Sequence, residues 1–271
     1  RSRKAAVGAR ECIILALVWF RSGSNVKMIA SHIGLEYQQC LRGLHCGIKA
    51  IAKCFEPFEA YGGAPTLKTF LEEDEKYGIP ERAQLSRFIV DGKHIEGKRI
   101  GSFEDASTYY SHKLGGLAYQ FQCVVTHLGQ CIHVSEAERA ATHDMMVYRR
   151  NRTQLLAGLL AKGMKEIVIL ADQGYKCELP ELFVPDKPNR ALNGRRLIVE
   201  NYFGRMTNAF RIVRMKFPFG YDMINPFLKA LCFLTNISIL RSPLRRNEYM
   251  LHRAFMECRR KKYEERRMRK Q

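Results

Sequence analysis

The chain has 271 residues, with 45 Lys and Arg against 27 Asp and Glu, which leaves a formal net charge of +18. Apolar residues make up 46%, with only 9 Pro and 20 Gly, so the composition excludes a disordered tail and a fibrous repeat. The length allows one large domain or two smaller ones. Excess positive charge attracts polyanions, so nucleic acid is the first partner to consider, and a solvated basic surface is the simpler alternative.

No segment predicts a membrane partner. The longest apolar run, Cys12 to Phe20, is much shorter than the roughly 18 to 20 residues of a spanning helix, and no cleavable signal pattern is visible. The nine cysteines include no CxxC pair and are typical of reduced intracellular thiols. One local cluster fits no zinc pattern and is interpreted as core thiols: Cys40, His45, Cys46 and Cys54.

The charge is uneven along the chain. Residues 1–54 carry a net charge of +7, residues 55–186 carry −4, and residues 187–271 carry +15. An acidic block between two basic ends opposes polyanion binding unless cations lie between its carboxylates and the phosphates. Divalent metal ions would supply those cations, although most of the acids fit an ordinary solvated surface.

The amino-terminal residues 1–60 predict a small helical region. A short helix over Asn25–Ile33, capped by Ser24 or Asn25, precedes Gly34 and a longer helix over Glu36–Phe55. This order is the outline of a helix-turn-helix, whose second helix lies in the major groove. A plain helical bundle has the same periodicity. If the second helix reads DNA, the side chains that would contact bases are Gln38, Gln39 and Arg42.

After a predicted linker over residues 61–86, the pattern changes to strands. A short apolar run ends at Asp91, a hairpin follows over Leu117–His127 and Cys131–Ser135, and a helix is expected over Thr142–Lys162. A third β-branched run, Glu166–Leu170, leads to Asp172. The next helix, Arg195–Val213, carries Glu200 beside its apolar stripe, and a further apolar helix is expected over Ile224–Ile239.

Two strands ending in Asp, followed by a helix bearing Glu, predict a catalytic centre. Parallel strands bring their carboxyl ends to one edge of a sheet, so Asp91 and Asp172 can converge there, and a helix packed on the sheet can add Glu200. Three close carboxylates raise one another's pKa unless cations compensate, and Mg²⁺ or Mn²⁺ prefers such oxygen ligands. A metal pair of this kind supports in-line attack on a phosphodiester. Taken singly, each residue also fits a turn or a solvated helix position.

At these residues the chain resembles the DDE transposase superfamily, in particular its PIF/Harbinger-type group. The matching segments are Val90-Asp91-Gly92-Lys93-His94-Ile95, Thr142-His143-Asp144, Leu170-Ala171-Asp172-Gln173-Gly174-Tyr175 and Arg196 through Met206. The resemblance implies that Asp91, Asp172 and Glu200 are a metal-binding catalytic triad. It also implies an α/β fold, a ribonuclease-H-like mixed sheet with flanking helices over residues 87–242, preceded by the helix-turn-helix.

The implied function is a transposase or endonuclease that cleaves and joins DNA with Mg²⁺ or Mn²⁺. Three departures from the group's pattern are Lys93, Met145 and Thr207-Asn208-Ala209. None removes a ligand, but Lys93 could compete with a metal ion, so a domesticated, catalytically silent DNA-binding regulator is the alternative. DNA, as transposon ends or target, is the expected partner. A separate DNA-binding protein and a second copy of the chain, since two ends must be handled together, also fit.

Further residues have predicted supporting roles. His94, His143 and Asp144 could lie in the second shell of the metal site, although a structural hydrogen bond of His94 and helix capping by Thr142 or Asp144 are simpler interpretations. The basic tail, residues 243–271, predicts nuclear import or DNA contact, and a solvated helix is its alternative. Besides the three side chains of the second helix, the predicted DNA contacts are Lys113, Arg196, Arg205, Arg211, Arg259, Arg260, Lys261 and Lys262.

Overall fold

The computed structural model of the chain describes residues 7–55, 86–98, 106–126, 129–161, 167–176, 179–185 and 190–242. The predicted linker, apart from Ser86, and the predicted basic tail lie outside the described residues. The proposed domain boundaries therefore stay predictions.

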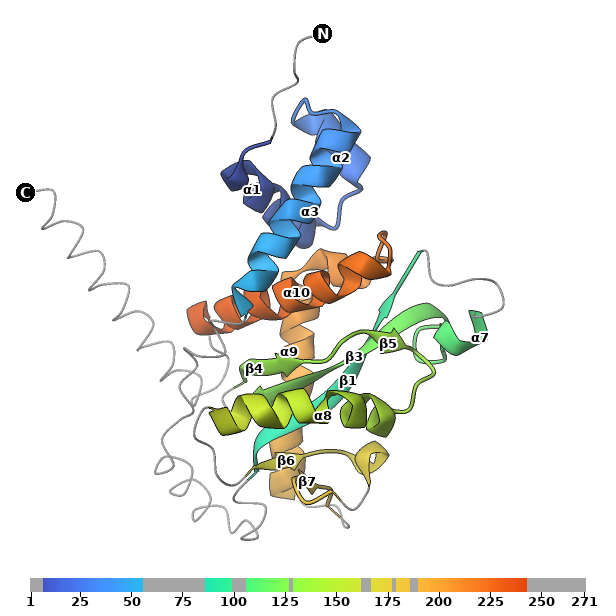
Figure 1. The fold of residues 1–271 in the computed structure, drawn as a ribbon, viewed down its shortest axis with the longest axis vertical. Coiled ribbons are helices and arrows are strands. Elements are labelled where there is room, and N and C mark those ends of the chain that lie inside the picture. Colours follow the sequence, from blue (N-terminus) through green and yellow to red (C-terminus); the bar gives the residue numbers. More distant parts are fainter. Residues whose placement is uncertain are drawn as a thin grey trace, which may run out of the picture.

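Three helices form the amino-terminal region: α1 (Ala9–Ser22), α2 (Val26–His32) and α3 (Tyr37–Lys53). The side chain of Asn25 caps α2 by accepting a hydrogen bond from the Lys27 N–H at 2.9 Å. Gly34 takes the left-handed conformation, with φ at 69°, which lets the chain turn between α2 and α3. The predicted short helix, glycine turn and longer helix are present, in a region that Figure 1 shows at one end of the molecule.

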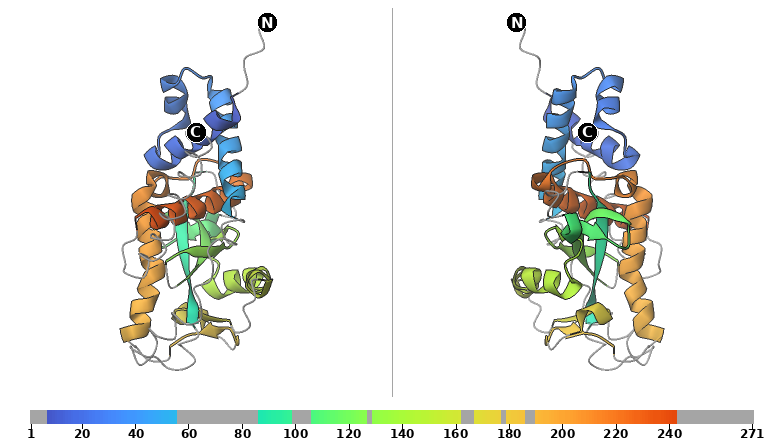
Figure 2. Two further views of the ribbon diagram at one scale, coloured as in Figure 1. Left: turned by 90° about the vertical axis from the view of Figure 1, so that its left-hand side faces the viewer. Right: turned by 90° about the vertical axis from the view of Figure 1, so that its right-hand side faces the viewer.

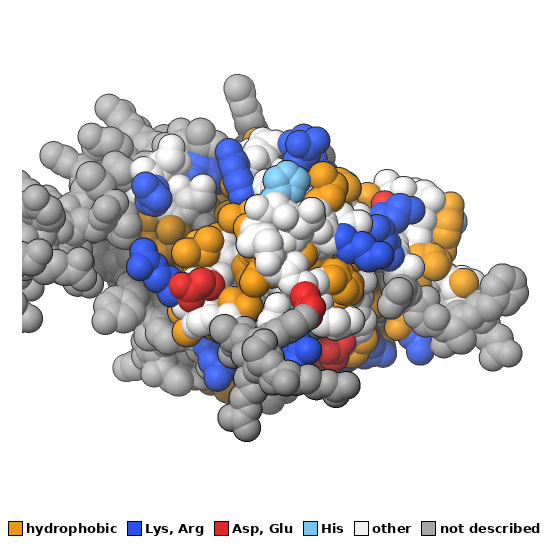
Figure 3. Space-filling view, turned by 90° about the horizontal axis from the view of Figure 1, so that it is seen from above, with side chains coloured by type: hydrophobic (Ala, Val, Ile, Leu, Met, Phe, Trp, Pro, Cys, Tyr) orange, Lys and Arg blue, Asp and Glu red, His pale blue; other side chains and the backbone are white. Residues whose placement is uncertain are grey.

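The helix α1 is buried on one side only. The run Cys12–Phe20 is apolar nearly all round, which favours a buried helix of a small bundle; one face of α1 packs on α3, whereas no layer lies above the other face among the described residues. Four large apolar side chains are 40–48% exposed: Ile13, Ile14, Leu17 and Val18. Figure 3, which looks onto this end, shows apolar side chains interspersed with Lys and Arg.

The sheet is mixed, and β1 (Ser86–Glu96) runs through its centre. On one side β1 pairs antiparallel with β3 (Gly116–Thr126), and on the other it pairs parallel with β6 (Val168–Leu170), which pairs parallel with β7 (Leu182–Phe183). β4 (Cys131–Val134) pairs antiparallel with β3, as the predicted hairpin requires. Shorter elements complete this part: α7 (Ala106–Tyr109), β2 (Tyr110–Ser111) and β5 (Glu138–Arg139), the last two pairing with β3.

Helices cover both faces of the sheet, which confirms the predicted fold class (Figures 1 and 2). One face packs against α8 (Asp144–Ala161), and the other packs against α9 (Arg190–Ala209) and α10 (Tyr221–Arg241). The helix predicted to reach Val213 ends at Ala209, and the chain continues as a 3-10 turn. Among the described residues the 3-10 turns are η1 (Gln173–Tyr175) and η2 (Arg211–Arg214).

The helix α10 joins the sheet to the amino-terminal helices. The ring of Trp19 on α1 lies 5.2 Å from that of Phe219 and 5.8 Å from that of Phe227 on α10, so one apolar core spans both regions. By length and apolarity α10 alone among the described helices could cross a membrane, but much of it is buried between the sheet and α3, as is usual for the core helix of a globular fold.

Candidate active site

The pairing register places Asp91 and Asp172 side by side. Ile89 on β1 is the partner of Leu170 on β6, and each Asp follows two residues later. Side chains two residues apart point to the same face of a sheet, and parallel neighbours lie about 4.8 Å apart. The two carboxylates therefore leave the sheet together where β6 ends. The Asp-Gly pair predicts that Asp91 lies at the end of its strand. Asp91 instead lies in the middle of β1, because pairing with β3 continues to Glu96.

Asp91 is a strongly perturbed acid. Its Oδ1 accepts a hydrogen bond from the Gly92 N–H at 2.7 Å. Burial, with repulsion from Asp172 and Asp144, nevertheless raises the pKa of Asp91 to about 6 from an ordinary 3.8. A carboxylate held among other carboxylates in a half-buried position is one whose ionised form calls for a nearby cation.

Asp172 begins the 3-10 turn η1 and faces α9. Its Oδ1 accepts a hydrogen bond from the Gly174 N–H at 2.9 Å, and its Oδ2 lies 3.8 Å from an Nη of Arg196. Both side chains of this ion pair are about one-third exposed, so the pair contributes at most about 1 kcal/mol to stability. Arg196, predicted to contact DNA, therefore lies against a predicted metal ligand.

The helix α9 presents Glu200 on the side of the two aspartates. Arg196, Glu200 and Phe203 are spaced so that they share one face of a helix. Arg196 contacts Asp172, and the ring of Phe203 lies 5.4 Å from Nζ of Lys93 on β1. Glu200 therefore lies between two contacts with the strands that carry the aspartates. Its side chain is exposed.

Lys93 extends over the ring of Phe203, and burial lowers its pKa while the Asp91 carboxylate opposes that shift. The ammonium group therefore interacts with the face of the Phe203 ring as well as with Asp91. The attraction to Asp91 favours the predicted competition between Lys93 and a metal ion, whereas the contact with the ring opposes it.

Two glycines open space beside the carboxylates. A Cβ on Gly92 would lie 2.9 Å from Oδ1 of Asp144, and a Cβ on Gly174 would lie 3.1 Å from Oδ1 of Asp172. The donors are hard carboxylate oxygens, which suit Mg²⁺ or Mn²⁺. Buried near them, Oε1 of Gln120 and the Tyr175 hydroxyl have no hydrogen-bond partner among the described residues. The residues therefore fit a divalent cation, although the carboxylates of Asp91, Asp172 and Glu200 do not lie within 4.8 Å of one another in the described chain.

The two histidines have structural contacts. Nδ1 of His94 lies 2.6 Å from Oγ of Ser111, and burial, helped by Lys113 and Lys93, lowers the pKa of His94 to about 4. His143 caps α8, since its Nδ1 accepts a hydrogen bond from the Met145 N–H at 3.2 Å. The expected cap, Thr142 or Asp144, was wrong, because the helix begins at Asp144 and the Asp144 carboxylate bonds to Gln120 instead.

The predicted DNA contacts have different surroundings. Gln38 and Arg42 are exposed on α3, whereas Gln39 closes a capping box with Glu36. Lys113 is exposed and acts electrostatically on Asp144. Arg205 donates to the backbone oxygen of Ser242 at 2.8 Å. Arg211 is exposed, and Arg259, Arg260, Lys261 and Lys262 lie outside the described residues.

A cleft of about 700 Å³ between the amino-terminal helices and the end of β1 adds cationic groups that the sequence pattern did not single out. Lys27, Lys98 and Lys216 line it together with Tyr37. Lys27 lies 5.9 Å from the centre of the Tyr37 ring, whereas Lys216 pairs with Glu96 at 2.5 Å. Cations beside an aromatic ring suit a nucleic-acid strand.

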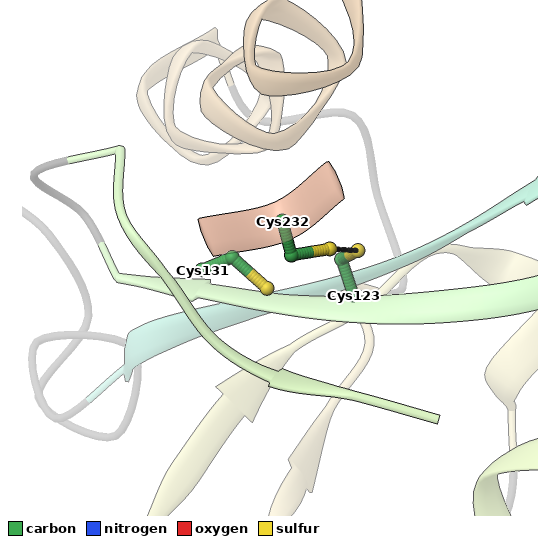
Figure 4. Close-up of side chains that lie close together, drawn as sticks. All are labelled: Cys123, Cys131 and Cys232. Carbon is green, nitrogen blue, oxygen red and sulfur yellow. Dashed lines mark hydrogen bonds between the residues drawn. The ribbon is translucent and has the colours of Figure 1, made fainter. Parts of the chain in front are cut away.

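A second group missed in the sequence is a buried thiol cluster of Cys123 on β3, Cys131 on β4 and Cys232 on α10 (Figure 4). Their sulfur atoms lie within 4.8 Å of one another, and the Sγ atoms of Cys123 and Cys232 are 3.7 Å apart. Burial raises the pKa of Cys123 and of Cys131, which favours neutral thiols packed in the core. The cluster predicted from spacing is not a core unit, since Cys40 is buried but Cys46 and Cys54 are exposed.

Comparisons with known proteins found two similar solved structures and one matching family. Similar solved structures include a pre-cleavage Mos1 transpososome, with 12% identity over 93% of this chain and 80% of that chain and a TM-score of 0.37. A Mos1 transposase paired-end complex with the left transposon end has 12% identity over 73% of this chain and 59% of that chain, with a TM-score of 0.22. No curated protein matches significantly.

These structural likenesses are partial, and the assignment rests on sequence. A family described as DDE superfamily endonuclease matches residues 90–236, which include both aspartates and Glu200. The match spans more than half of the chain, and the protein therefore belongs to the DDE superfamily endonuclease family.

Proposed function

We propose that the protein is a DNA transposase or endonuclease of the PIF/Harbinger type, in which Asp91, Asp172 and Glu200 hold divalent metal ions. The observation that supports this most is the register of β1 and β6, which sets Asp91 beside Asp172 under the face of α9 that bears Glu200. The family match spans all three residues.

Each residue has a physical task in this proposal. When bound, a Mg²⁺ or Mn²⁺ pair supplies an activated water or 3′-hydroxyl nucleophile and stabilises the leaving oxygen. Asp91 and Asp172 bind from the sheet, whose backbone fixes their separation, while Glu200 binds from a helix. The Gly92 and Gly174 N–H groups orient the two aspartates. In this proposal Arg196, which pairs with Asp172, and Lys113, which acts electrostatically on Asp144, contact phosphate beside the carboxylates.

Nicking or strand transfer on DNA with Mn²⁺ tests the proposal. Asp91→Ala, Asp172→Ala and Glu200→Gln should each abolish activity while the circular dichroism and melting curves still show a folded protein. Glu136→Gln, which removes an exposed acid from the turn after β4, is the matched control and should remain active. Activity that persists in all three variants would exclude this catalytic assignment.

A second candidate is a catalytically silent DNA-binding regulator. Two basic side chains at the site favour this candidate, because they could neutralise the aspartates in place of a metal ion: Arg196 pairs with Asp172, and Lys93 is attracted to Asp91. A silent regulator would bind DNA in a salt-dependent manner that neither chelation nor the three substitutions change. Binding that requires Mn²⁺ would count against it.

The remaining features of the proposal concern partners and location. We propose that transposon ends or target DNA contact the basic surface, that two copies handle two ends, and that a separate DNA-binding protein can assist recognition. The basic cluster of residues 259–262 would direct the chain to the nucleus. Fusion of residues 243–271 to a fluorescent protein tests import: a fusion that stays evenly distributed contradicts it.

A further inference from the structure

The carboxylate of Asp144 reaches the candidate metal site from the side of the sheet opposite Glu200. Asp144 is the first residue of α8, whereas Glu200 belongs to α9, and Figure 2 shows these helices on opposite sides of the strands. Two bare glycines let Asp144 approach: Oδ1 would lie 2.9 Å from a Cβ on Gly92, and Oδ2 would lie 3.5 Å from a Cβ on Gly174.

Asp144 and Asp172 border the same space. The position of a Cβ on Gly174 lies 3.1 Å from Oδ1 of Asp172 and 3.5 Å from Oδ2 of Asp144. One oxygen of each carboxylate thus borders the space where a side chain of residue 174 would begin. Glycine leaves this space free, and any larger residue at position 174 would fill it.

Buried amides hold Asp144 in this position. Nε2 of Gln120 donates to Oδ1 of Asp144, and Nε2 of Gln122 donates to the Asp144 backbone oxygen at 2.6 Å. Both glutamines lie on β3 and are no more than 3% exposed. Since His143 caps α8, the Asp144 carboxylate is not needed for capping, and the hydrogen bond from Gln120 occupies Oδ1 rather than Oδ2.

A second, independent observation points to a ligand here. Gln120 is 2% exposed, its amide lies against Asp144, and its Oε1 has no hydrogen-bond partner among the described residues. The buried Tyr175 hydroxyl is also unpartnered, and the charges of Asp144, Asp91 and Asp172 all act on it. A buried acceptor and a buried hydroxyl beside several carboxylates suit the hydration shell of a bound cation, because such groups seldom remain unsatisfied.

We propose that Asp144 is a fourth carboxylate of the divalent metal site, binding a cation through Oδ2 together with Asp172. This inference rests on the proposed function. Asp91 and Glu200 then complete the coordination from the α9 face, so the cations are held between two layers of the fold rather than on one face of the sheet. Gln120 is the positioning residue that sets the rotamer of Asp144.

Titration of the intact protein with MnCl₂, followed by calorimetry and by the electron paramagnetic resonance signal of free Mn²⁺, tests this without any activity. Asp144→Asn keeps the side-chain volume and an acceptor for Gln120 but removes the charge of Oδ2. We expect Mn²⁺ affinity to fall by about ten- to a hundredfold. Asp172→Asn should lower affinity at least as much, and Glu136→Gln, an exposed acid of the turn after β4, should not change it.

The outcomes separate the two proposals. Mn²⁺ affinity that falls in Asp172→Asn but not in Asp144→Asn overturns the inference and leaves the proposed function standing. Affinity unchanged in both variants contradicts the proposed function itself. A purely structural Asp144 would lower the melting temperature with metal affinity intact, which also overturns the inference. If Asp144→Asn does not fold, Asp144→Ser is titrated in its place and the same criteria apply.

Discussion

At the scale of single residues, the site depends on where charge is buried. Asp91 is held in a half-buried position with Asp172 and Asp144 nearby, and its pKa of about 6 records the cost of ionising it there. Burial likewise raises the pKa of Asp144, with Lys113 opposing the shift. Ionising such a cluster of carboxylates without a cation costs free energy, so the cluster lowers the stability of the folded protein. The same cluster favours binding of a metal ion, which would neutralise the carboxylates.

This cost gives a pH-dependent prediction. Because the pKa of Asp91 is higher in the folded protein than its ordinary 3.8, the folded state binds the proton more tightly, and stability falls as pH rises from about 4 to about 6. With EDTA present, Asp91→Asn should therefore raise the free energy of unfolding at pH 7.5 by up to about 3 kcal/mol. Below pH 4 the variant and the wild type should have the same stability.

Urea unfolding at pH 3.5, 5 and 7.5 measures this difference. The exposed-acid variant Glu136→Gln serves as the control, because its side chain lies outside the carboxylate cluster. A stability gain in Asp91→Asn that does not depend on pH would show that packing, rather than ionisation, causes it.

At the scale of elements, close packing of helices decides the amino-terminal region. Gly47 on α3 faces α1 so closely that a Cβ would lie 2.0 Å from the backbone oxygen of Cys12. Gly158 on α8 is exposed, and a Cβ there would meet nothing within 4 Å. The two glycines differ only in their surroundings, since both lie inside helices.

Alanine at the two positions should therefore have opposite effects. Gly47→Ala should destabilise the protein by about 1–3 kcal/mol or more, because α1 and α3 must separate. Gly158→Ala should stabilise it by about 0.5–1 kcal/mol, because alanine loses less backbone entropy in a helix. Thermal and urea unfolding of both variants provide the test, and a neutral Gly47→Ala would mean that α1 does not pack on α3 as described.

At the scale of the whole molecule, a chain with a net charge of +18 holds a site that contains several carboxylates. The cleft between the amino-terminal helices and the end of β1 places Lys27 and Lys98 together, although 71 positions separate them in the sequence. Under the proposed function, a DNA strand that leaves the carboxylates along β1 would pass this cleft.

If so, Lys27→Glu combined with Lys98→Glu should weaken DNA binding equally for all sequences. The slope of the logarithm of affinity against the logarithm of salt concentration should decrease in size by about 2, one for each lost phosphate contact. Lys53→Glu, at the end of α3 and outside this cleft, is the control with the same charge change per residue. A salt slope equal to that of the wild type in the double variant would exclude the cleft from the DNA path.

Local patterns in the sequence were enough to predict much of the fold. The β-branched runs, the hairpin and the apolar helical stripes are local features, and the helix boundaries they predict differ from those observed by a few residues. The exceptions have physical causes: Asp91-Gly92 is not a turn because β3 continues to pair with β1, and α9 stops early because the chain turns at Phe210.

The sequence by itself determined the family and the basic composition, and it predicted the three ligands, because these depend on residue types in a fixed order. Only the tertiary structure decided which groups meet. The nearness of Asp144 to Asp172, the Arg196 ion pair, the cleft of lysines and the three core thiols all join residues from different elements. The polar pair Gln120 and Gln122 within an apolar strand was the one local signal of the Asp144 contact. Strand register and helix packing set such distances, and neither can be read from residue spacing along the chain.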